Sequence, residues 1–409
     1  MKERIRQEEV VQSDYVQLFS NYLAEQQIVY IMSFGSLLDL ERLNAAVNNL
    51  IKDYPFLSSK IEQVDEKFVR TYCEKTVIID RNDIVELEKF VLEKNDPFQC
   101  DTLKVGLFSD GLRDTMCIKF DHTITDGYGA KLICHNIAEN YRNNCANKSI
   151  FRKQVPLGLV KTEGRESKQP APVFMPMKFD FRRNEKFWIN KKINPVHFSK
   201  IQNVCHKYET TINDVLLASL YYALEDTFDI VDEIELPVMV PVDLRSFIGS
   251  DYKKSIGNMT STVFVQLKIR KDEKIEERLK KVHDVMNGFK SDYEGLLSNY
   301  YSSIKIAQKP VEQNVDYYSK ISRGGSGFYA LTNFGIMNQE VFNFDDNIDI
   351  LDIQILGPFQ FPSGALFSVS TYKSQLNLNV VSFDRESYCK YLDKIVDGME
   401  KYIIAIGNL

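Results

Sequence analysis

The sequence predicts a mixed α/β (α+β) fold built as two lobes, each with helices packed on a largely antiparallel sheet. The first observation is length, because 409 residues exceed the roughly 250–300 at which a single hydrophobic core stops growing. The second is the alternation of apolar and polar residues over short runs, which is typical of strands. The third is the recurrence of apolar residues every three or four positions elsewhere, which indicates amphipathic helices.

The first 143 residues alternate between these two patterns. A helix is predicted to begin after Asp39, a residue type that caps helix N-termini, and to end before Pro55. The other predicted elements are strands at 59–62, 67–72, about 103–110 and 115–122, and helices near 83–94 and 130–141. In the last of these strands the alternation puts His122 on the apolar side, at the strand end, and Asp121 on the opposite face.

Residues 143–178 are rich in Pro, Gly and charge and show no sustained period, which is typical of a crossover between lobes. We therefore assign residues 1–165 to a first lobe and 166–409 to a second. The second lobe has a buried helix capped by Thr211, a charged helix near 272–289, a Tyr-rich stretch without a clear pattern and a closing helix with Tyr391 on its apolar face. Predicted strands lie at 235–242, 262–269, 327–335, 348–356, 365–372 and 375–383.

The amino-acid composition limits the kinds of molecule that the protein is expected to bind. The net charge of −6 and pI near 5.6 argue against a nucleic-acid surface, which needs a basic excess to neutralise phosphates. The N-terminus lacks the apolar core of a signal peptide, and no run of about 18 apolar residues occurs. We therefore expect a cytoplasmic monomer.

Seven scattered cysteines without a CxxC pair predict reduced thiols. The sequence contains neither an HExxH motif nor another set of residues spaced as metal ligands.

The informative motif is the hexapeptide at 122–127, His-Thr-Ile-Thr-Asp-Gly. It places an imidazole and a carboxylate four positions apart across a predicted strand-to-helix turn. The pKa of an unperturbed histidine is about 6.5, so a neutral ring is available at pH 7 to accept a proton. General base catalysis by His122 would need no nucleophilic serine or cysteine.

This hexapeptide resembles the HxxxDG signature of the superfamily that contains chloramphenicol acetyltransferase, plant BAHD acyltransferases, wax-ester synthases and condensation domains of nonribosomal peptide synthesis. The chain looks nearest to the condensation-like and wax-ester-synthase-like members. Five further segments are similar to family segments in the same order: 39–61, 211–224, Pro-Val-Asp-Leu-Arg at 241–245, Ile-Gly-Asn-Met-Thr-Ser-Thr-Val at 256–263, and Leu-Thr-Asn-Phe-Gly at 331–335. The resemblance thus covers nearly the whole chain.

The resemblance implies two lobes shaped like chloramphenicol acetyltransferase subunits, with a channel between them and an acyltransferase activity. His122 would deprotonate a hydroxyl or amine acceptor that attacks a thioester of coenzyme A or of a phosphopantetheinyl carrier protein. No permanently bound cofactor is implied. Asp126 would turn away and hold the loop through an ion pair with Arg245, and Gly127 would permit close backbone approach. Near the Gly-Asn segment, Asn258, Ser261 and Thr262 are candidates to hydrogen-bond substrate.

Two departures from the family pattern matter. Many condensation domains have two adjacent histidines, and here the first is Asp121. The DFGWG motif of BAHD enzymes is absent, which argues against that branch. Because the superfamily contains inactive members, the alternative is a non-catalytic protein that binds a carrier protein or an acylated ligand. A metal hydrolase is a more distant alternative.

Overall fold

The computed structural model describes residues 7–65, 67–143, 150–156, 159, 173–174, 186–230, 234–270, 273–310, 312–313, 315–316, 326–358, 365–383 and 385–409. The chain divides into two compact units. The first comprises residues 1–157, 245–259 and 336–358, and the second comprises 158–244, 260–335 and 359–409. The boundary predicted between residues 165 and 166 lies outside the described residues.

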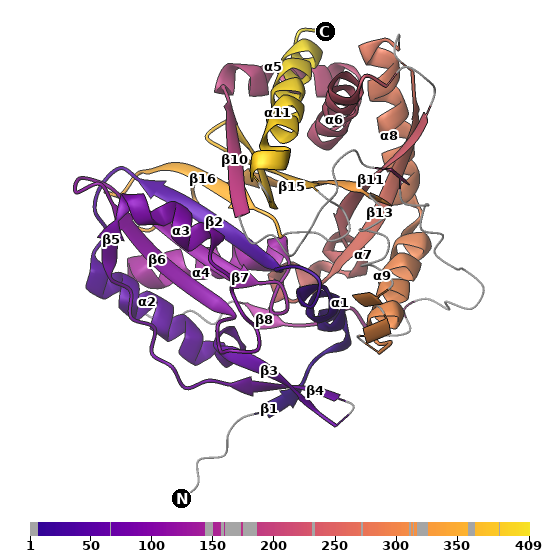
Figure 1. Ribbon diagram of the computed structural model, residues 1–409. Helices are drawn as coiled ribbons and strands as arrows, with labels where there is room; N and C mark the ends of the chain where they lie inside the picture. Colours follow the sequence, from indigo (N-terminus) through magenta and orange to yellow (C-terminus); the bar gives the residue numbers. More distant parts are fainter. Residues whose placement is uncertain are drawn as a thin grey trace, which may run out of the picture. The chain divides into compact units, whose positions relative to one another are not determined.

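The first unit contains a mixed sheet of five strands (Figure 1). Its order is β16 (Ile350–Leu356), β2 (Gln27–Phe34), β7 (Asp114–Asp121), β6 (Leu103–Ser109) and β5 (Arg81–Asp83). Every pairing that involves β2 or β7 is antiparallel, and the short edge strand β5 pairs parallel with β6. The strand β16 comes from the last third of the sequence and completes this sheet beside β2.

Two smaller sheets accompany it. One is antiparallel, with the order β1 (Gln7–Glu9), β4 (Lys67–Tyr72) and β3 (Ser59–Val64), and the other pairs β8 (Phe151–Arg152) parallel with β12 (Ser255–Ile256). The helices of this unit are α1 (Gln12–Asn21), α2 (Leu40–Asp53), α3 (Leu87–Leu92), α4 (Gly127–Asn143) and the single turn α7 (Arg245–Ile248). Short 3-10 turns occupy 55–57, 84–86 and 250–254. The helix predicted near 83–94 is therefore shorter than expected.

The strand that leads to the candidate site is buried on both faces. Met116, Ile118 and Phe120 of β7 are inaccessible to solvent, as the alternation predicts. Lys119 on the other face is equally buried, and its ammonium donates to the carbonyls of Phe90 and Glu93. A buried ammonium needs such acceptors. The end of β7 is consequently a fixed point from which the following turn departs.

The second unit contains a mixed sheet of six strands. Its order is β10 (Lys186–Ile193), β18 (Gln375–Phe383), β17 (Ala365–Tyr372), β15 (Tyr329–Met337), β11 (Ile234–Asp243) and β13 (Thr260–Ile269). The pair β11–β15 is parallel, whereas β10–β18, β17–β18 and β11–β13 are antiparallel. The short strands β14 (Ser326–Gly327) and β9 (Val173–Phe174) also pair.

Helices flank this second sheet: α5 (Pro195–Lys207), α6 (Ile212–Phe228), α8 (Ile275–Ser291), α9 (Tyr293–Ala307) and α11 (Arg385–Gly407). The predicted cap of α6 is present, because the Thr211 hydroxyl accepts from the Asp214 backbone and the Asp214 carboxylate accepts from Thr211. The Tyr-rich stretch without a clear pattern is helix α9. Tyr391 of α11 is exposed rather than buried, whereas the other apolar residues predicted for the same face, Leu392, Ile395, Met399 and Ile403, are buried.

Both units thus contain a mixed, largely antiparallel sheet with flanking helices, and the predicted fold class is confirmed. Within the described part of the chain, none of the helices combines the length and the apolar character needed to cross a bilayer.

The prediction of reduced cysteines is wrong for one pair. Cys73 and Cys100, which are 27 positions apart, form a disulfide within the first unit. The spacing of the two cysteines matches no known motif, so the sequence does not predict the pair. They meet because the fold places the residue after β4 beside the segment before β6. Cys117, Cys134 and Cys205 are buried free thiols and Cys389 is a partly exposed one, whereas Cys145 lies outside the described residues.

Candidate active site

His122 follows the last residue of β7 and precedes α4, so a strand, a turn and a helix carry the motif as predicted. Its backbone N–H donates to the Gln26 carbonyl at 2.7 Å, which continues the pairing between β7 and β2 by one residue. The ring is half-buried, and Nδ1 lies 3.0 Å from Oδ1 of Asn258. Among the described residues, Nε2 has no hydrogen-bond partner.

Burial lowers the pKa of His122 below its ordinary value of 6.5, because a low-dielectric environment disfavours the imidazolium. The charges of Asp126 and Asp14, and hydrogen bonds to Asn258 and the residue's own carbonyl, oppose this effect without cancelling it. The ring is therefore neutral at pH 7 and can accept a proton.

Asp126 and Arg245 form the predicted ion pair, and both side chains are buried. The pair is bidentate: Nη1 donates to Oδ2 at 2.9 Å and Nη2 donates to Oδ1 at 3.0 Å. Burial by itself would raise the pKa of the Asp126 carboxyl. The charge of Arg245 and hydrogen bonds from Arg245 and from the backbone N–H groups of Gly129 and Met259 have the larger, opposite effect, so the pKa lies below its usual value. The carboxylate thus binds the turn after His122 to the segment that begins with α7.

Arg245 extends this connection to the backbone. Its Nε donates to the Ser255 carbonyl at 3.1 Å, and Nη2 also donates to the Gly257 carbonyl at 3.0 Å. Its guanidinium lies over the Tyr128 ring, 4.8 Å from the centroid. One buried arginine therefore holds together both ends of the 245–259 segment and the start of α4.

The first turn of α4 contains two glycines, Gly127 and Gly129. The Gly127 carbonyl accepts from the Tyr30 hydroxyl at 3.0 Å, which ties the helix start to the sheet. A β-carbon at Gly129 would collide with the Thr125 hydroxyl, so this position requires glycine although the motif does not include it. The Gly129 N–H already donates to Asp126 and is not available for a substrate oxygen.

Of the three predicted substrate-binding residues, Asn258 belongs to the same unit as His122. The Asn258 amide donates to Oδ1 of Asp14 at 2.9 Å and to the His122 carbonyl at 2.8 Å, so its contacts serve the histidine itself. Ser261 and Thr262 belong to the second unit. There the Ser261 hydroxyl donates to the Leu296 carbonyl at 2.7 Å, and the Thr262 carbonyl accepts from Asn299.

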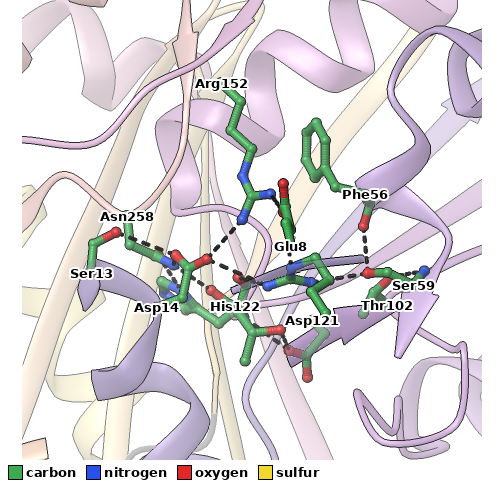
Figure 2. A network of polar contacts seen from close by, with 12 residues as sticks. Glu8, Ser13, Asp14, Phe56, Ser59, Thr102, Asp121, His122, Arg152 and Asn258 are labelled. Carbon is green, nitrogen blue, oxygen red and sulfur yellow. Dashed lines mark hydrogen bonds and ion pairs between the residues drawn. The ribbon is translucent and has the colours of Figure 1, made fainter. Parts of the chain in front are cut away.

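A group of charged side chains near the turn was not predicted, and two of its members, Asp14 and Arg70, are buried (Figure 2). Asp14 of α1 is bound by Arg152 of β8 at 3.0 Å and by Arg70 of β4 at 3.4 Å. Arg70 also donates to the Thr123 carbonyl at 2.9 Å. Glu8 accepts from Arg152 and adds a second carboxylate. We call these four residues, Glu8, Asp14, Arg70 and Arg152, the charge cluster.

Burial, together with the neighbouring Arg152, lowers the pKa of Arg70 to about 10, so the guanidinium is still protonated at neutral pH. Arg70 sits at a buried position of β4. The only sequence signal for it is an arginine within the alternating run Phe-Val-Arg-Thr-Tyr at 68–72.

Asp121 turns away from the ring, as strand alternation predicts. Its carboxylate accepts from the backbone and hydroxyl of Thr123, and from the Asn21 amide at 3.3 Å. Burial raises the pKa of this carboxyl to about 6. The residue in place of the first histidine thus shapes the backbone of the turn.

A scan against protein-family models and a search of curated proteins gave no match. Solved structures do match over nearly the full length. The first condensation domain of the calcium-dependent antibiotic synthetase, in complex with a substrate analogue, has a TM-score of 0.70 at 14% identity, with 99% of this chain and 97% of that chain covered.

Two further structures have the same fold. The trichothecene 15-O-acetyltransferase TRI3 from Fusarium sporotrichioides has a TM-score of 0.70 at 13% identity, with 97% of this chain and 95% of that chain covered. The polyketide synthase associated protein 5 from Mycobacterium tuberculosis has a TM-score of 0.64 at 14% identity, with 97% of each chain covered. The chain therefore shares the fold of condensation domains and of this acetyltransferase along its whole length.

Proposed function

We propose that this protein is an acyltransferase that moves an acyl group from a thioester to a hydroxyl or amine acceptor, with Nε2 of His122 as general base. The observation that carries the proposal is a neutral imidazole, anchored through Nδ1, on a turn held by the buried Asp126–Arg245 pair. The shared fold supports it, because one of the similar structures is an acetyltransferase and another is a condensation domain.

The chemistry balances without a cofactor or a covalent enzyme intermediate. The acceptor O–H or N–H gives its proton to Nε2 as its lone pair attacks the thioester carbonyl. The tetrahedral intermediate collapses with cleavage of the C–S bond, and the imidazolium returns the proton to the departing thiolate. An ester or amide and a free thiol result. Asp126 and Arg245 hold the turn and take no proton in this scheme.

The donor in this proposal is an acyl thioester of coenzyme A or of a phosphopantetheinyl carrier protein, and the acceptor is a small molecule. The proposal takes the protein as a monomer, because two lobes in one chain make an active site shared between subunits unnecessary. Ser261 and Thr262 remain candidates for contact with substrate. We also propose that a channel between the two lobes admits donor and acceptor to His122.

The test is thiol release from acyl-CoA and from acylated carrier protein, each offered with a panel of alcohols and amines. Wild-type protein should release thiol in step with ester or amide formation. His122→Ala should lose about 10²–10⁴-fold of the rate, the usual contribution of a general base. His206→Ala, a change at an exposed histidine of α5, is the matched control and should keep full activity.

The pH profile gives a second readout. Because the pKa of His122 lies below 6.5 and the deprotonated ring is the reactive form, kcat/KM should stay constant around neutrality and fall as the pH drops through that lowered pKa. A folded His122→Ala variant with full turnover would refute the assigned base. Binding of acylated ligand without any turnover would instead identify a non-catalytic binding protein.

A further inference from the structure

One amide lies between the candidate base and the charge cluster. Asn258 is 5% exposed and has hydrogen bonds in two directions. Its Oδ1 faces Nδ1 of His122 at 3.0 Å, and its Nδ2 faces Oδ1 of Asp14 at 2.9 Å and the His122 carbonyl at 2.8 Å. Figure 2 shows Asn258 next to Asp14 and His122.

The neighbours of the amide fix its orientation. A carboxylate at neutral pH and a backbone carbonyl only accept hydrogen bonds, so the two groups on one side of Asn258 both require an N–H donor. Reversing the amide would place its oxygen against both acceptors. The NH₂ group therefore faces Asp14 and the His122 carbonyl, and the amide oxygen faces the ring.

The orientation of the amide determines where the ring proton is. An amide oxygen has no hydrogen to give, so its hydrogen bond with the ring requires a proton on Nδ1. In a neutral imidazole the other nitrogen, Nε2, then carries the lone pair. This is the nitrogen without a partner among the described residues.

The charge cluster makes the arrangement rigid. Asp14 is 1% exposed and has Arg152 and Arg70 as counter-ions, so it cannot release Asn258 to find a solvent partner. Arg70 also holds the Thr123 carbonyl, one residue beyond His122. The ring and the amide are thus fixed to the same group of side chains from α1, β4 and β8.

We propose that Asp14 and Asn258 are positioning residues that select the Nδ1–H tautomer of His122 and so present the lone pair of Nε2 to the acceptor. The catalytic meaning of this inference rests on the proposed function. The tautomer itself is a property of the resting protein and can be measured without substrate.

The direct test is nitrogen NMR of protein labelled at the histidine ring nitrogens, at a pH where His122 is neutral. His122→Ala identifies its signals among those of the five histidines. Wild-type protein should show a protonated Nδ1 and an unprotonated Nε2. Asn258→Ala should shift the population toward the Nε2–H form. Asn48→Ala, which removes a half-buried amide that supports the Val77 backbone in the same unit, should leave the His122 signals unchanged.

Kinetics separate positioning from a general loss of structure. Asn258→Ala should lower kcat by about 10–100-fold, part of the contribution expected of a general base, with little change in KM. The Asn48→Ala control should change neither constant.

The inference and the proposed function fail in different ways. A proton on Nε2 in wild-type protein would overturn the inference, even if the protein turns over thioesters. This test uses wild-type protein and therefore does not depend on whether Asn258→Ala folds. An unchanged tautomer in folded Asn258→Ala would overturn it as well. A protonated Nδ1 in a protein without turnover would refute the proposed function and leave the tautomer assignment intact.

Discussion

Each partner of the Asp126–Arg245 pair depends on the other, because both are almost inaccessible to water. A carboxylate or guanidinium left alone in such a place would have lost its hydration without compensation. The same two side chains also satisfy the backbone N–H groups of Gly129 and Met259 and the carbonyls of Ser255 and Gly257. Removal of either partner should therefore affect the whole turn.

We expect Asp126→Ala and Arg245→Ala each to lower the free energy of unfolding by about 3–5 kcal/mol, and the double variant to lose much less than the sum. Urea unfolding measures all three. The exposed Lys67–Glu9 pair of the same unit is the control, and Lys67→Ala should have little effect because solvent screens that pair. Additive losses at Asp126 and Arg245 would contradict a direct interaction.

The pH dependence has a definite sign. The folded-state pKa of Asp126 is below its usual value, so its stabilisation is present above about pH 4, the unfolded pKa of an aspartate, and is lost as the pH falls through the folded pKa. The difference in stability between wild type and Asp126→Asn should accordingly shrink on acidification.

At the scale of residues, a sequence motif predicts what is local. His122, Asp126 and Gly127 lie within six positions, and the partner Arg245 could be named only through a family resemblance. The charge cluster could not be predicted, because Asp14 meets Arg70 across 56 positions and Arg152 across 138. Asn258 was named as a candidate to contact substrate, but its contact with Asp14 spans 244 positions and could not be predicted from the sequence.

At the scale of elements, apolar periodicity predicts amphipathic helices such as α2 with its Asp39 cap, which accepts from the Arg42 backbone. Periodicity does not predict α9, because the hydroxyl groups of tyrosine and serine interrupt its apolar pattern. Seven residues of this helix are nevertheless buried. The cap of α9, Asp292, accepts from the Gly295 backbone and is visible only in the structure. The strand β16 was predicted as a strand, but pattern alone does not say which sheet it joins.

The connection from β12 to β13 contains a glycine that the fold requires. Gly257 has φ of +147°, and a β-carbon there would collide with the Lys153 carbonyl of the chain beside β8. Its own carbonyl accepts from Arg245. The backbone passes closely at this point, directly before Asn258, so both the conformation and the space exclude a side chain.

We expect Gly257→Ala to destabilise the protein by more than Gly111→Ala. Gly111 also has a positive φ, +90°, but has open space around it, so its substitution costs only backbone strain, about 1–3 kcal/mol. Gly257→Ala adds a collision with backbone, typically about 1–3 kcal/mol more. Urea unfolding of the two variants makes the comparison. Equal losses would show that the close approach at Gly257 has no energetic consequence.

At the scale of the whole molecule, the chain divides into two compact units, and the disulfide and the only tryptophan lie in different units. Cys73–Cys100 belongs to the first unit and Trp188, on β10, to the second. Trp188 donates from its indole to Asn379 of the neighbouring strand, so its fluorescence reports on the six-stranded sheet. Buried Cys117 and Cys134 report on the first unit through their reactivity with a thiol reagent.

We expect the disulfide to stabilise one unit selectively. Closing a loop of this length contributes about 2–4 kcal/mol through the entropy of the unfolded chain. Replacing Cys73 and Cys100 together by serine should expose Cys117 and Cys134 to the reagent at lower urea, while the midpoint of Trp188 fluorescence stays constant. Cys389→Ser should change neither signal, because that thiol lies on α11 of the second unit. If the fluorescence midpoint falls together with thiol protection, the two units unfold as one and are not independent folding units.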